Sequence, residues 1–253
     1  MSVLAEPAVA TAAFRSIVRR AALALVLTAG ASQAAQLTIT GPDGSGAFGT
    51  TVTTLPNGNI VVTDPGFDAP GPIADVGAAY LYRPDGSLIS TLRGSSAGDK
   101  VGNGVVAVLA NGNYVVATAT ATADGWATWG SGATGVSGVV GLGNSLHGPW
   151  QVVPLANGHY VATLTTAADA TDLVTWGNGA GGTVGEATAA NSREGHLTAA
   201  SSVTALSDGS YVVTSPDSAD TRGTVTWVSG AGPSSGPLTA SHTLTGQASG
   251  SRI

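Results

Sequence analysis

Aspartates recur at similar places along the chain, and their side chains are the ones best suited to chemistry. Eight of them follow β-rich runs in four similar stretches: Asp64, Asp68, Asp75, Asp124, Asp169, Asp172, Asp217 and Asp220. Carboxylates gathered on one face could recruit calcium or a basic partner, or they could simply keep polar loops solvated. Glycoside hydrolysis needs two facing carboxyl groups at a defined separation. The spacing within a repeat does not supply that separation.

Five tryptophans divide into two groups. Trp129, Trp176 and Trp227 recur at one position of a repeated pattern, which favours packing between neighbouring units over sugar stacking. Trp126 and Trp150 fall outside that register, so we expect them to be available to a ligand. The candidate ligand-binding residues are therefore Trp126, Trp150, Asp64, Asp68, Asp217 and Asp220.

Other catalytic and metal-binding chemistries find little support. The four histidines, His147, His159, His196 and His242, lack the short spacing of a zinc site. The chain has no cysteine, which excludes thiolate zinc sites, cysteine nucleophiles and disulfides. No Gly-x-Ser-x-Gly elbow precedes a predicted helix. We predict no catalytic residue, no metal and no cofactor, and therefore a protein that is not an enzyme.

The first 34 residues have the pattern of a secretory signal peptide. Arg15, Arg19 and Arg20 precede the apolar run Ala21–Ala29, and small residues at 32 and 34 suit cleavage after Ala34. The apolar run is far shorter than the ~20 residues of a membrane span. We expect a secreted protein, extracellular or on the cell surface, with the periplasm as an alternative, and no membrane insertion of the mature form.

The charge balance excludes whole classes of partner. Only 9% of the residues are charged, and residues 35–253 hold 6 basic against 14 acidic side chains. Nucleic acids and anionic lipid surfaces bind chiefly through Lys and Arg. We therefore expect neither as a partner.

The elements that would position these residues form a repeat. One pattern, a leucine followed by Asn-Gly or Asp-Gly and a β-rich run, occurs at Leu55–Val62, Leu109–Val116, Leu155–Ala162 and Leu206–Val213. Asn, Asp and Gly tolerate the positive φ that hairpin turns demand. Each pattern predicts two strands joined by a tight turn.

Two more strands follow in each repeat. Alternating segments at Gly77–Leu81, Gly125–Trp129, Asp172–Trp176 and Gly223–Trp227 predict a half-buried third strand. Leu146, Arg193 and Leu244 each lie 17 residues after the repeated tryptophan and mark a fourth. Four antiparallel strands in about 50 residues are typical of a β-propeller blade. No helical periodicity follows residue 34, so we predict an all-β, propeller-like array of four four-stranded blades.

The repeats resemble two known families. The first, with Phe48-Gly49, Asn57-Gly58 and Asp85-Gly86, is similar to the FG-GAP repeat of integrin-α-type propellers. The later ones, with Asn-Gly-Asn-Tyr-Val-Val at 111–116 and Thr-Trp-Gly at 128–130 and 175–177, resemble repeats of secreted bacterial haemagglutinin-like proteins. The resemblance implies an extracellular adhesion or binding module. FG-GAP propellers hold calcium in a carboxylate-rich turn, but of the matching turns here only the last offers a carboxylate, Asp208.

We expect the array to be open or incomplete. Units are predicted at about 48–100, 101–150, 151–197 and 198–253, with an additional unassigned strand at 36–41. The sequence stops where a fifth unit would begin, which suggests a longer parent or completion by another copy. Exposed strand edges would then allow self-association.

The sequence thus predicts a secreted, non-enzymatic repeat module that binds a protein or glycan. The alternatives are a structural spacer of a larger surface protein and, with less support, an extracellular hydrolase that uses the acidic loop face.

Overall fold

The architecture is that of an all-β array, seen here in a computed structural model. It describes residues 36–71, 73–119, 125–148, 151–164, 172–195, 197, 201–216, 222–238 and 242–247. From Leu37 onward these residues belong to one compact unit, Leu37–Ile253. Within these ranges there is no helix, and so none long and apolar enough to cross a membrane.

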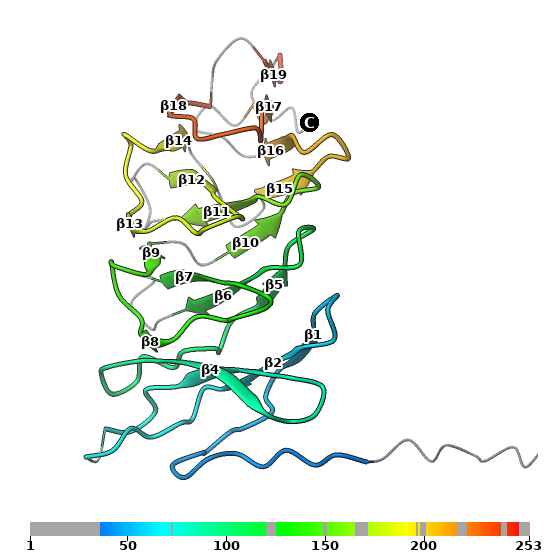
Figure 1. Cartoon of the computed structure of the whole chain (residues 1–253). Coiled ribbons are helices and arrows are strands. Elements are labelled where there is room, and N and C mark those ends of the chain that lie inside the picture. Colours follow the sequence, from blue (N-terminus) through cyan, green and yellow to red (C-terminus); the bar gives the residue numbers. More distant parts are fainter. Residues whose placement is uncertain are drawn as a thin grey trace, which may run out of the picture. The chain divides into compact units, whose positions relative to one another are not determined.

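The strands form four sheets that follow one another in chain order (Figure 1). The first contains β1 (Val52–Thr54), β2 (Ile60–Asp64), β3 (Ala78–Tyr82) and β4 (Leu88–Arg93). The second contains β5 (Val106–Val108), β6 (Tyr114–Ala119), β7 (Gly125–Gly130) and β9 (Ser145–His147). The third contains β10 (Gln151–Pro154), β11 (Tyr160–Leu164), β12 (Asp172–Gly177) and β14 (Ser192–Gly195). The fourth contains β15 (Ser202–Ala205), β16 (Tyr211–Ser215), β17 (Thr224–Val228) and β19 (Thr243–Thr245).

These strands confirm the predicted fold class. Within each sheet the four strands pair antiparallel in sequence order, as in the blade of a propeller. Among the described residues no strand ladder joins the first sheet to the fourth.

The predicted hairpin turns join the first two strands of each sheet. Gly58, Gly112, Gly158 and Gly209 all have φ between 84° and 86°. In the first turn the N–H of Gly58 donates to the carbonyl of Leu55, and the N–H of Leu55 donates to the carbonyl of Asn59. This is a turn with a bulge at its glycine, where a side chain would be strained.

A feature that the sequence did not predict is that each later repeat lends a short strand to the repeat before it. The donated strands are β8 (Gly138–Val139), β13 (Gly185–Glu186) and β18 (Gly236–Pro237). They pair parallel with β4, β9 and β14 respectively, and they lie on the side of the array opposite the first strands (Figure 1). The first three sheets are therefore five-stranded, each completed by the repeat that follows.

Side-chain hydrogen bonds reinforce each junction. In the first three hairpin turns the asparagine Nδ2 donates to a glycine carbonyl of the next repeat: Asn57 to Gly132 at 2.7 Å, Asn111 to Gly179 at 2.8 Å and Asn157 to Gly230 at 2.9 Å. The indole N–H groups of Trp129 and Trp176 donate to the last two of those carbonyls, each at 2.9 Å. The repeated tryptophans thus connect neighbouring units, as the sequence indicated.

The hydrophobic core lies between successive sheets. Separate clusters fill the spaces between the first and second, second and third, and third and fourth sheets. Inner strands are covered on both faces, so all five residues of β3 are buried. The expectation of a half-buried third strand is therefore wrong for this sheet, because a neighbour or a loop packs on each side.

The outer face of the first sheet is covered by loops. Phe48 and Phe67 pack on Tyr80, with ring centroids 5.7 and 6.4 Å apart, and Ile39 joins the same cluster. Residues 36–41 form no strand, which corrects the prediction of an additional one there. Their apolar-x-Gly pattern matched a fourth strand, but Ile39 packs in this covering cluster instead.

Candidate functional site

Two of the four acidic loop residues that the structure describes are buried. Asp64 is fully buried, and its Oδ1 accepts the N–H of Ala47 at 2.7 Å. Asp172 is also buried and accepts the N–H of Leu197 at 2.6 Å. These two carboxylates position loops and do not face a soluble partner. Four of the eight lie outside the described residues: Asp124, Asp169, Asp217 and Asp220.

Asp68 is exposed, as is Asp75 in the same loop. Its Oδ1 accepts the N–H of Asp75 at 2.8 Å, within a loop closed by a bridge between Ala69 and Ile73. Asp75 itself has a φ of 53°. No group of three or more potential metal ligands occurs among the described residues.

Trp126 lies on β7 and stacks on His147, with ring centroids 4.2 Å apart. His147 Nδ1 lies 2.8 Å from Glu186 Oε2 on the donated strand β13. Trp126, His147 and Glu186 therefore join the second repeat to the third. The other aromatic candidate, Trp150, lies outside the described residues.

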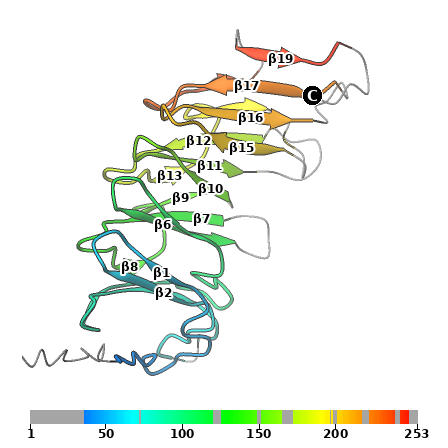
Figure 2. The same ribbon diagram turned by 90° about the vertical axis from the view of Figure 1, so that its right-hand side faces the viewer.

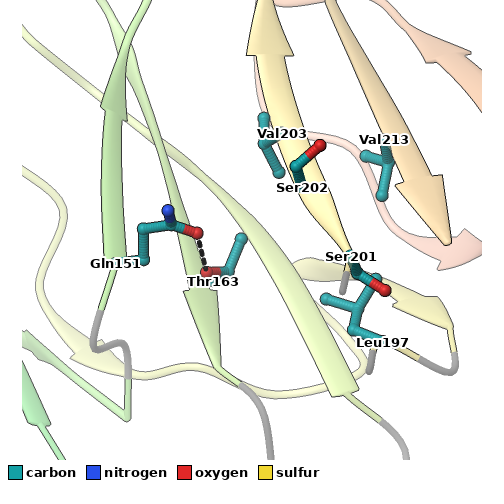
Figure 3. Close-up of a pocket in the computed structure, with 7 residues that line it drawn as sticks. All are labelled: Gln151, Thr163, Leu197, Ser201, Ser202, Val203 and Val213. Atoms are coloured by element: carbon teal, nitrogen blue, oxygen red, sulfur yellow. Dashed lines mark hydrogen bonds between the residues drawn. The ribbon is translucent and has the colours of Figure 1, made fainter. Parts of the chain in front are cut away.

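A small groove lies between the third and fourth sheets. Figure 3 shows its lining residues, which come from both sheets and from the segment between them: Gln151, Thr163, Leu197, Ser201, Ser202, Val203 and Val213. Because it needs strands of two repeats, the groove exists only where the repeats stack. Its interior is small, about 20 Å³, which is room for about one water molecule. A ligand would therefore lie across the groove and would not be enclosed by it.

The groove presents neutral polar groups above an aliphatic floor. The Thr163 hydroxyl donates to Gln151 Oε1 at 3.4 Å, the dashed line of Figure 3. The Ser202 hydroxyl lies 2.7 Å from that of Thr214. Leu197 and Val213, which also line the groove, are buried.

The groove's chemistry is that of recognition. Hydroxyl and amide groups can hydrogen-bond a sugar hydroxyl or a peptide amide, and the aliphatic side chains can contact an apolar face. None of the seven lining residues is charged. Sequence reasoning missed them because small polar residues on strands carry no motif.

A buried tyrosine recurs at the same position in three of the repeats. Tyr114, Tyr160 and Tyr211 open the second strand of their repeats and are at most 2% exposed. Burial raises the pKa of each phenol to about 12. They lie inside the array, where they belong to the core clusters between successive sheets.

The fold and its junctions define the protein as a tandem β-repeat array with a groove at a repeat boundary. The chain belongs to a family described as a repeat of unknown function, DUF5650, whose model matches residues 108–151, 154–201 and 205–253. The matched segments correspond to the second, third and fourth repeats.

Other comparisons are distant. A solved structure of a protein of unknown function from Bacteroides caccae is 15% identical, with a TM-score of 0.35. The match covers 69% of this chain and 55% of that one, so the chain spans about half the length of that protein. No curated protein matches the sequence.

Proposed function

We propose that this chain is a secreted, non-enzymatic repeat module that binds a protein or a glycan. The observation that carries the proposal is the neutral groove between the third and fourth sheets, with Gln151 and Ser202 at its exposed rim. The signal-peptide pattern supports export to the cell surface, the extracellular space or the periplasm. The resemblance to FG-GAP and haemagglutinin-like repeats supports adhesion or binding.

Glycan and protein arrays probed with residues 35–253 test this proposal. A specific ligand should lose affinity in Gln151→Ala and Ser202→Ala. Thr204→Ala should leave it unchanged, because Thr204 is exposed on the same strand as Ser202 but does not line the groove. Absence of binding on both arrays, or equal binding by all three variants, contradicts the proposal.

A second candidate function is that of a spacer within a larger surface protein. The continuous junctions favour it, since donated strands and asparagine bonds link every repeat to the next. A spacer would bind no ligand and would resist stretching. In that case force spectroscopy on tandem copies would show high unfolding forces, and the glycan and protein arrays would show no bound ligand.

Self-association is a further proposal about partners. The outer edge of β1, the first strand of the first sheet, has no strand beside it among the described residues, and free edges pair with other strands. Light scattering over a range of protein concentrations would detect this association.

A further inference from the structure

The fourth repeat ends in a surface that corresponds, position by position, to the three filled junctions. We define this terminal surface by Asp208, Ser210, Trp227, Leu244 and Thr245. Figure 2 shows β17 and β19 at this end of the array. Leu92 and Leu146, which occupy the position of Leu244 in the first two sheets, are at most 1% exposed, but Leu244 is 69% exposed. Trp227 is 41% exposed.

The filled junctions show the path that an occupant takes. In each of them a segment starts at the hairpin turn of the preceding repeat and passes along that repeat to its fourth strand. A glycine whose carbonyl accepts from the turn asparagine starts the segment, and six residues later another glycine begins the donated strand: Gly132 and Gly138, Gly179 and Gly185, Gly230 and Gly236. The third residue of the donated run then donates its N–H to the fourth strand: Val140 to Arg93, Ala187 to His147 and Leu238 to Glu194. A nine-residue segment fills each junction: it begins in a turn or bend and ends in the donated strand.

At the terminal surface the turn presents a hydrogen-bond acceptor where the turns of the other repeats present a donor. Asp208 stands where the other repeats have Asn57, Asn111 and Asn157. Its Oδ1 still accepts the N–H of the residue two positions later, Ser210, at 2.9 Å, as the asparagines do. Its second oxygen replaces the amide group that donates to the next repeat, so a carbonyl in that place would meet a carboxylate and be repelled.

The indole N–H of Trp227 also has a different kind of partner from those of its counterparts. Trp129 and Trp176 donate their indole N–H to the next repeat, but Trp227 donates to Ser210 Oγ of its own repeat, at 2.9 Å. Among the described residues no strand lies beside the outer edge of β19, so the terminal surface keeps the path of a junction while it excludes the standard occupant. A group that donates hydrogen bonds, and above all a cation, suits the place opposite Asp208.

We infer that the terminal surface binds an extended cationic peptide. The peptide pairs parallel with β19, contacts Trp227 and Leu244, and places a Lys or Arg opposite Asp208. Continuity with three filled junctions supports the strand pairing. The net charge of −6 favours a cationic peptide over a second copy of this acidic chain. The inference concerns a surface apart from the groove, so it does not depend on the proposed function.

The test uses residues 35–253 and two fluorescent nine-residue peptides. Both follow the sequence of residues 132–140, Gly-Ala-Thr-Gly-Val-Ser-Gly-Val-Val. One has Lys in the first place, and the other keeps Gly and is acetylated. We expect at least about tenfold tighter binding of the Lys peptide, measured by fluorescence anisotropy, and weaker binding of it in higher salt.

Variants locate the binding. Asp208→Asn should invert the preference, because it restores the donor that suits a carbonyl. Leu244→Ala should weaken both peptides. Two matched controls should change neither: Asp85→Asn, since Asp85 accepts the N–H of Ser87 in the same type of turn on the first repeat, and Leu88→Ala, since Leu88 is 51% exposed on β4.

Three results would overturn the inference. One is that neither peptide binds. Another is that the native protein and Asp208→Asn show the same preference between the Lys peptide and the Gly peptide. The third is concentration-dependent association of the protein that Leu244→Ala abolishes, because a second copy would then be the occupant.

Discussion

The indole N–H of Trp176 donates to the carbonyl of Gly230, at 2.9 Å, across the boundary between the third and fourth repeats. Trp176→Phe keeps an aromatic ring and removes this bond. We expect it to lower the free energy of unfolding by about 1–2 kcal/mol, measured by urea denaturation. Trp227→Phe should cost less, because its bond to Ser210 lies within one repeat and the ring is 41% exposed. Equal losses would show that the junction bond adds no stability.

Truncation of the same tryptophan tests its packing. Trp176→Ala should cost on the order of 3–5 kcal/mol, as large aromatic truncations in cores do. Trp126→Ala should cost less, since Trp126 loses mainly its stacking on His147. Similar shifts of the melting temperature for the two variants would contradict this assignment.

Gly179→Ala should prevent stable folding. An added Cβ at this position would lie 1.7 Å from the carbonyl oxygen of Gly158, which is backbone and cannot move aside. The matched control is Gly181→Ala, where the nearest atom would be 3.8 Å away. We expect the control to unfold at nearly the native urea concentration, and the loss of the cooperative transition only in Gly179→Ala.

Asn157→Asp converts the third hairpin turn to the chemistry of the fourth. The Oδ1 acceptor for His159 remains, but the donor to Gly230 is lost and a carboxylate faces its carbonyl. We expect a loss of about 1–3 kcal/mol in urea denaturation. Asn178→Asp is the control, because the Oδ1 of Asn178 accepts the N–H of Ala180 within its own loop. A near-neutral Asn157→Asp would mean that the asparagine bonds add little to stability.

Alkali should destabilise the array through its buried tyrosines. The pKa of Tyr160 is about 12 in the folded protein and about 10 in an unfolded chain. The folded state therefore keeps the proton longer, and its stability falls as the pH rises from 10 to 12. Tyr160→Phe should reduce the fall in the free energy of unfolding with pH by the part that Tyr160 causes, up to ~1.4 kcal/mol per pH unit. Denaturation curves at pH 9, 10 and 11 would check it, and an unchanged slope would contradict it.

The strands and turns could be predicted from the sequence because the leucine and Asn-Gly pattern marks each hairpin. The donated strands could not. Gly138–Val139, Gly185–Glu186 and Gly236–Pro237 are two residues long, too short for any periodicity, and they share only the glycine. The constant six-residue spacing from Gly132, Gly179 and Gly230 was the available signal.

The candidate site was harder to predict than the fold. The sequence predicts Asp64 as a ligand-binding carboxylate, but its burial and its hydrogen bond to the N–H of Ala47 depend on the fold of a loop 17 residues away. The groove is likewise invisible in the sequence, because Gln151 and Ser202 come together only when two repeats stack.

Strand donation also gives the array a direction of growth. Leu92 pairs with Gly138, 46 positions later, and Leu146 pairs with Gly185, 39 positions later. A chain that emerges from its N-terminus can finish each sheet only when the following repeat arrives. At any moment a single unfinished sheet is then open to wrong pairing, and the next repeat to appear closes it. Vectorial synthesis or export would thereby protect each repeat in turn, which refolding of the whole chain from denaturant would not.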